Sequence, residues 1–177
     1  MRLTLPLLVL SSAAAAQDEG AQSLPADLDG DGVMEVFSLA PNGNGGADLV
    51  IEDDGALIVA ENFAWHGDLE YQQPSLSLAE NNTLHVLSMN EASGPPWHMT
   101  ISVFHDGETY RVGGIVHDWY DRIDPELGSV CVLNLVTGDG TVTAMSGEIR
   151  TLEPPTGPLE IGEWQAGITA LPVECFD

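Results

Sequence analysis

The feature of this 177-residue sequence that most constrains its fold is the shortness of its apolar runs. The runs are rich in valine, isoleucine, leucine, threonine and aromatic residues, and glycine, aspartate, asparagine or proline interrupts them roughly every 8 to 12 residues. Long helical periodicity is absent. The pattern predicts an all-β, mostly antiparallel fold, which is either a sandwich or a partial, propeller-like stack of sheets.

The apolar runs place the expected strands, and Asp-Gly dipeptides between them place the turns. Asp54-Gly55, Asp106-Gly107 and Asp139-Gly140 predict hairpin turns, because both residue types tolerate a positive φ. The predicted strands are Val33–Leu39, Ala47–Glu52, Ala56–Glu61, Ser75–Leu78, Thr83–Met89, Trp97–His105, Tyr110–His117, Val130–Val136 and Thr141–Met145, with Ile168–Leu171 as a further candidate.

The clearest predicted hairpin joins 97–105 to 110–117 through a turn at Asp106-Gly107-Glu108. Successive side chains of a strand point to opposite faces, so the apolar and polar positions of its first strand separate. We expect one face toward the core and one wetter face. The apolar face holds Trp97, Met99, Ile101 and Val103, and the other holds His98, Thr100 and Ser102.

The first 16 residues have the layout of a secretory signal peptide: Arg2, the apolar run Leu3–Leu10, and an A-x-A cleavage pattern before Gln17. The alternative is a short N-terminal core segment. The apolar run is far shorter than the ~20 residues that cross a bilayer. We expect a signal peptide at 1–16, a single secreted or periplasmic domain at 17–177, and no membrane insertion after cleavage.

The charge is strongly one-sided, since 28 acidic residues face four arginines and no lysine, a formal net charge of −24. Such a surface repels phosphate backbones, which excludes nucleic acid and anionic membranes as favoured partners. It attracts cations. A salty habitat would also select an acidic surface, and composition leaves both interpretations open, as it does the choice between a protein and a glycan partner.

The two cysteines, Cys131 and Cys175, are predicted to form a disulfide, because export places the chain in an oxidising compartment. The bridge would tie the C-terminal tail to an apolar segment in the middle of the chain. No thiol would then remain for catalysis or for metal binding.

The loop at 27–35 carries the strongest chemical pattern in the sequence. Carboxylates stand at alternate positions, Asp27, Asp29 and Asp31, followed by the Val33 carbonyl and the Glu35 carboxylate. Calcium prefers six to eight oxygen ligands, and alternate positions in a tight loop aim several oxygens at one point. The sequence therefore predicts a Ca²⁺ site. An aspartate- and glycine-rich turn without an ion is the alternative.

The loop resembles known calcium-binding repeats. Gly30 and Gly32 permit its sharp bends, as in an EF-hand, but Ser38 stands where that motif needs glutamate, and Val33–Leu39 reads as a strand. The pattern D-x-D-G-D-G-x-x-E instead resembles the loops of FG-GAP and VCBS repeats, which lead directly into a strand. The resemblance covers about residues 25–39 and implies metal-supported β-structure.

A second resemblance concerns the region from Arg111 to Thr137-Gly138, which includes His117-Asp118-Trp119 and the run Cys131–Leu135. It is similar to a group of small secreted bacterial proteins with no assigned activity. This likeness informs location and implies no mechanism.

The densest other acidic cluster lies in the segment 118–126. Paired carboxylates can act as general acid and base in glycoside hydrolysis, so a secreted or periplasmic hydrolase is one hypothesis. A solvated acidic loop between two strands is the simpler interpretation. The residues concerned are His117, Asp118, Asp121, Asp124 and Glu126.

Other chemistries find little support in the sequence. The five histidines never occur at zinc spacing, no G-x-S-x-G motif is present, and few cations are available for phosphoryl transfer. The leading hypothesis is an exported calcium-binding module with a binding or structural role and no assigned catalytic residue. The tryptophans, which fit a sugar-binding surface or simple packing, are Trp65, Trp97, Trp119 and Trp164.

Overall fold

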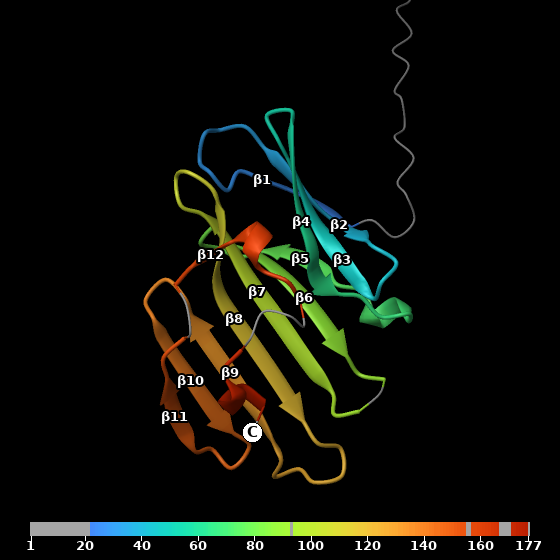
Figure 1. The fold of residues 1–177 in the computed structure, drawn as a ribbon, viewed down its shortest axis with the longest axis vertical. Coiled ribbons are helices and arrows are strands. Elements are labelled where there is room, and N and C mark those ends of the chain that lie inside the picture. Colours follow the sequence, from blue (N-terminus) through green and yellow to red (C-terminus); the bar gives the residue numbers. More distant parts are fainter. Residues whose placement is uncertain (1–21, 93, 155–156, 167–170, 177) are drawn as a thin grey trace, which may run out of the picture.

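The computed structural model describes residues 22–92, 94–154, 157–166 and 171–176 (Figure 1). These residues form two antiparallel sheets and no α-helix. The small sheet has the strand order β1-β2-β3-β4. Its strands are β1 (Ser23–Ala26), β2 (Glu35–Pro41), β3 (Gly46–Asp53) and β4 (Ala56–Trp65).

The large sheet has the order β11-β10-β9-β8-β7-β6-β5, and β12 pairs with one end of β8. Three short 3₁₀-helices, η1 (Glu70–Gln72), η2 (Ile161–Glu163) and η3 (Val173–Phe176), complete the described elements. None of the described helices has the length and apolar character needed to cross a membrane. The strands are β5 (Ser75–Leu78), β6 (Leu84–Asn90), β7 (Trp97–His105), β8 (Tyr110–Tyr120), β9 (Gly128–Asn134), β10 (Asp139–Ala144), β11 (Ile149–Leu152) and β12 (Leu159–Glu160).

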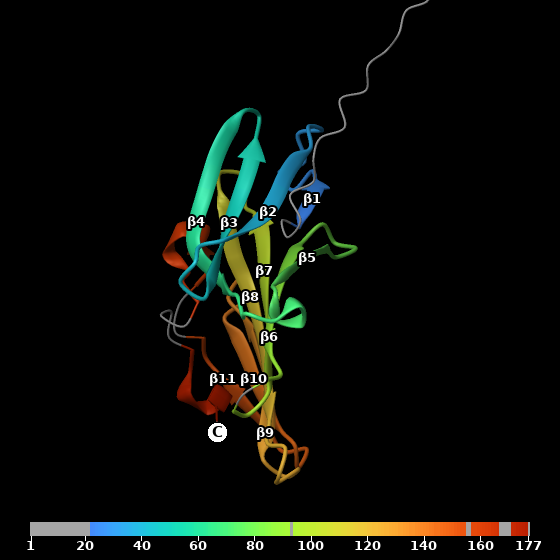
Figure 2. The same ribbon diagram turned by 90° about the vertical axis from the view of Figure 1, so that its right-hand side faces the viewer.

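The two sheets pack face to face around one apolar core, as in a sandwich. Phe37 and Ile51 of the small sheet and Ile101 and Val103 of the large sheet are fully buried. Phe37 also meets Tyr110 edge-on, with ring centroids 5.9 Å apart. In Figure 2 the small sheet lies beside only the upper part of the large sheet, while η3 lies beside the lower part. The all-β antiparallel prediction is confirmed.

The predicted strands agree with β2 to β10, and the bounds of β5 and β7 match. The other bounds differ by up to four residues. Three strands were missed: β1 contains Pro25, which only an edge strand tolerates, while β11 is mostly exposed and β12 is very short. The signal peptide at 1–16 and most of the candidate strand 168–171 lie outside the described residues, and Leu171 is not in a strand.

Two of the three predicted Asp-Gly turns are confirmed. Asp54 and Gly55, at φ 42° and 81°, close the β3–β4 hairpin, and Asp106-Gly107 lies in the β7–β8 turn. The third prediction is wrong, because Asp139 already begins β10. The turn lies closer to the N-terminus than predicted, because the side-chain oxygen of Asn134 stabilises it there. This oxygen accepts hydrogen bonds from the backbone amides of Val136 and Thr137, both at 3.0 Å.

A β-bulge in β8 decides which side chains reach the interior. Val103 pairs with Val112, but the preceding residue of β7 pairs with Gly114, so one extra residue lies in β8. Val112 and Ile115 are consequently both buried although three positions separate them. The bulge places His117, two residues further along, on the interior face as well.

Candidate metal site

The acidic loop is the turn of the β1–β2 hairpin. Ala26 pairs with Glu35, the first residue of β2, so Asp27 and Glu35 lie at the two ends of the loop. Gly30 and Gly32 have φ values of 79° and 89°, a region that is strained for residues with a side chain. The loop therefore leads directly into a strand, as predicted, although β2 begins later than expected.

The three aspartates order the loop through its own backbone. Asp27 accepts hydrogen bonds from two backbone amides, at 2.8 and 3.2 Å. Asp29 and Asp31 each accept one from the amide two residues ahead, at 3.0 and 2.7 Å. Such bonds are typical of aspartate-rich turns, so they explain the shape of the loop without an ion.

Glu35 differs from the three loop aspartates, because its side chain is only 1% exposed. Hydrogen bonding within a surface turn does not explain a buried carboxylate. The backbone N–H of Leu28 donates a hydrogen bond of 2.8 Å to the Glu35 carboxylate. Burial is the main cause that raises the pKa of Glu35, and the charges of Asp29 and Asp53 raise it further. The hydrogen bond from Leu28 opposes this shift only in part.

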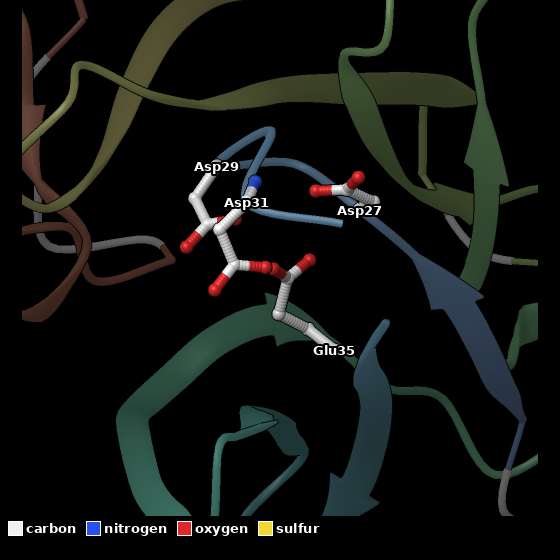
Figure 3. Close-up of side chains that lie close together, drawn as sticks. All are labelled: Asp27, Asp29, Asp31 and Glu35. Atoms are coloured by element: carbon white, nitrogen blue, oxygen red, sulfur yellow. The ribbon is translucent and has the colours of Figure 1, made fainter. Parts of the chain in front are cut away.

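The four carboxylates converge on one space between the loop and the start of β2 (Figure 3). One oxygen from each of Asp27, Asp29, Asp31 and Glu35 lies within 4.8 Å of the other three. None of the ion pairs found among the described residues involves any of these carboxylates. A group of four acidic oxygens without a cationic side chain can bind a metal ion.

Two residues that are distant in sequence form hydrogen bonds to the loop or near it. The side chain of Asn82 donates a hydrogen bond to the Asp27 carbonyl. The Tyr110 hydroxyl donates one of 2.9 Å to Asp53. Burial, that hydrogen bond and the charge of Glu35 raise the pKa of Tyr110. No local pattern signals these contacts, since 55 and 57 positions separate the partners.

The predicted disulfide is present between Cys131 of β9 and Cys175 of η3. It closes a loop with a sequence separation of 44 and holds the C-terminal 3₁₀-helix on the lower part of the large sheet. A structural disulfide is typical of proteins in an oxidising setting, extracellular or periplasmic.

The acidic segment 118–126 does not form a converging group. Asp118 faces His98 at 2.7 Å, and His98 also contacts Glu91 at 2.9 Å. Asp121 accepts hydrogen bonds from two backbone amides ahead of it, which lower its pKa. Asp124 likewise accepts one from an amide ahead, at 3.1 Å. Asp121 and Asp124 thus stabilise their own turns, and Asp118 forms a local pair with His98.

No protein-family model matches the chain, and comparison with curated proteins and with solved structures gave no significant match. The convergence of the four carboxylates and the burial of Glu35 are therefore the observations that point to a metal site.

Proposed function

We propose that this chain is an exported β-domain that binds one calcium ion between Asp27, Asp29, Asp31 and Glu35, with the Val33 carbonyl as a further ligand. The buried, negatively surrounded carboxylate of Glu35 carries the proposal. Burying a carboxylate without a counter-charge is costly, and a divalent cation removes that cost together with the repulsion among the aspartates.

Calcium fits the donor set better than other common metals. Every side-chain donor is a carboxylate oxygen, whereas zinc sites usually include histidine or cysteine. Calcium–oxygen distances of about 2.4 Å place opposite ligands about 4.8 Å apart, and the four oxygens all lie within 4.8 Å of one another. Magnesium demands a smaller and more regular shell and retains several waters. Calcium is also plentiful outside the cytoplasm, where the disulfide is stable.

The role that this position supports is structural: the ion braces the N-terminal strand. Among the described strands, β1 lies at the edge of the small sheet and pairs only with β2, and the loop joins the two. An ion held by Asp27 at one end of the loop and Glu35 at the other would fix this hairpin. The FG-GAP and VCBS likeness supports the same role for the loop, and the domain would serve as a binding or structural module. The hydrolase alternative gains no support from the separated carboxylates of 118–126.

Calorimetric titration of the mature domain with CaCl₂ and with MgCl₂ tests this proposal. We expect one calcium per chain, and at least about tenfold weaker binding for Asp31→Asn, since a ligand charge is lost while the turn hydrogen bond is kept. Asp124→Asn is the matched control, because Asp124 also accepts a backbone hydrogen bond in an exposed turn. Wild-type affinity in Asp31→Asn would overturn the site, and equal affinity for magnesium would overturn its assignment to calcium.

A further inference from the structure

The described residues enclose part of a cavity of about 730 Å³. Most of its lining residues lie at the end of β4 and on β6, β7 and β8, and those of the C-terminal part are Trp164, Ala166, Leu171 and Phe176. The volume is in the range of small-molecule sites, about 300 to 1,000 Å³. All four tryptophans of the chain line it. We call it the aromatic cavity, and its main lining residues are Trp65, Trp97, Trp119, Trp164, His117 and Phe176.

The rings form a continuous aromatic wall. Trp65 and Trp97 meet edge-on with centroids 5.3 Å apart, and Trp97 lies 6.3 Å from His117. His117 lies 5.0 Å from Phe176, which the disulfide of η3 keeps beside the sheet. Trp164 has a structural role, because it is 1% exposed and its Nε1 donates a 2.8 Å hydrogen bond to a backbone carbonyl of β4. Trp65, Trp97 and Trp119 are only partly buried.

Two polar atoms in this wall lack a partner. Among the described residues, His117 Nδ1 and Trp119 Nε1 are the buried side-chain nitrogen or oxygen atoms without a hydrogen bond. The two residues are two positions apart on β8, so their side chains share one face and lie about 7 Å apart along the strand. Leaving such atoms unpaired is costly, and native proteins usually pair them with protein groups, water or a ligand.

The two nitrogen atoms differ in hydrogen-bonding character, and this difference defines the polar groups that a ligand must offer them. Indole Nε1 is only a donor, so Trp119 needs an acceptor. Burial is the main cause that lowers the pKa of His117, which favours the neutral ring. Its hydrogen bond with the Cys175 backbone opposes that shift, which is the effect of a ring N–H that donates to a carbonyl. The other nitrogen, Nδ1, is then an acceptor that needs a donor.

A hydroxyl group is both a donor and an acceptor, so hydroxyl groups satisfy both atoms. A quaternary ammonium offers no acceptor to Trp119. An anion offers no donor to His117 and is repelled by the net charge of −24. The apolar part of the wall requires a ligand with an apolar face. Sugar rings combine an apolar C–H face with a rim of hydroxyl groups.

We propose that the aromatic cavity binds a neutral saccharide, whose ring packs against Trp65 and Trp97 and whose hydroxyl groups bond to His117 Nδ1 and Trp119 Nε1. This site is separate from the acidic loop, and it adds a class of ligand, neutral saccharides, to the proposed binding module. Saccharide binding does not require the calcium site to be correct.

The test is binding of the mature, disulfide-bonded domain to a microarray of neutral glycans, followed by calorimetry with neutral tetrasaccharides such as cellotetraose, chitotetraose and mannotetraose. We expect saturable one-to-one binding to at least one neutral saccharide. Trp119→Phe keeps a ring but removes the N–H, and we expect about tenfold weaker binding. Trp97→Leu should weaken binding at least as much through lost stacking. Tyr71→Leu, at an exposed aromatic residue that does not line the cavity, should bind like wild type.

Thermal unfolding of each variant separates a lost ligand contact from a lost fold. A folded Trp119→Phe protein with wild-type affinity would overturn the hydroxyl contacts, and a folded Trp97→Leu protein with wild-type affinity would overturn the stacking. Absence of binding to every neutral glycan would overturn the proposal. Choline and anilinonaphthalene sulfonate serve as cationic and anionic aromatic-site probes, and tighter binding of either than of any saccharide would also contradict it.

Discussion

Replacing Glu35 with glutamine gives the sharpest test of the metal site, because the expected effect changes sign with calcium. Glutamine has nearly the same shape, and its side-chain oxygen can still accept the hydrogen bond from Leu28. In a chelator, the variant should be more stable than wild type, because a buried carboxylate beside other carboxylates destabilises the fold. In calcium, it should be less stable, because a charged ligand of the ion is missing.

The magnitude follows from the distances. Two unit charges 4.8 Å apart repel by about 0.9 kcal/mol in water and by about 3.5 kcal/mol at an effective dielectric constant of about 20. Salt and solvent favour the lower value for the loop aspartates, so removing one charge that faces three others relieves about 2 to 3 kcal/mol. For a domain of this size that corresponds to a melting temperature roughly 4 to 12 °C higher in chelator. Calcium at about 1,000 times its dissociation constant should stabilise wild type by about 4.1 kcal/mol, which exceeds the about 2 to 3 kcal/mol that the variant gains in chelator. We expect Glu35→Gln, which lacks the buried charged ligand, to bind calcium too weakly to gain comparable stability at that concentration.

Differential scanning calorimetry of wild type and Glu35→Gln, each in EDTA and in excess CaCl₂, measures both effects. The two melting temperatures should exchange order between the two buffers. Asp124→Asn, which lies in the exposed turn of 121–127, should show no such exchange. If Glu35→Gln raised the melting temperature equally in both buffers, the four carboxylates would be a repulsive turn without an ion, and the reasoning would be refuted.

Two further predictions concern the lower end of the large sheet. Replacing Cys131 and Cys175 together with serine should destabilise the domain by about 4 kcal/mol on the chain-entropy model for a sequence separation of 44, measured by denaturant unfolding; an unchanged midpoint would contradict this. Burial lowers the pKa of His117, so the folded state favours the neutral ring. The contribution of this neutral ring to the stability of the fold is present above about pH 6.5 and is lost as the pH falls through the folded pKa. Relative to His117→Gln, wild type should therefore lose stability between pH 7.5 and pH 5, and a difference that is constant with pH would refute the assignment.

The two ends of the molecule differ in how their chemistry is built. At one end, four acidic residues from a single hairpin form the candidate metal site, and a distant asparagine supports it. At the other end, elements from most of the chain enclose the aromatic cavity, and the disulfide holds its C-terminal wall. The candidate metal site and the proposed ligand site thus share no residue.

Local chemistry explains what was predictable. The bounds of Trp97–His105 follow from period-two alternation, and the turn at Asp54-Gly55 follows from two residues that accept a positive φ. The acidic loop was visible because its donors lie within nine residues of chain, at Asp27 to Glu35. The disulfide was predictable from the presence of only two cysteines and an expected oxidising compartment.

The remaining features depend on contacts between distant segments. The alternation on the apolar face of β7 was right, but only the tertiary structure shows that Ile101 is fully buried while Trp97 lines a cavity, because the small sheet covers one part of the large sheet. Likewise, the extra residue near Gly113 reverses the alternation within β8 and turns His117 inward. The sequence by itself determined most of the strands and the acidic loop, since short-range physics governs them, and it determined the bridge because the chain has only two cysteines. Packing of the two sheets decided which side chains are buried, since burial depends on residues that are far apart along the chain.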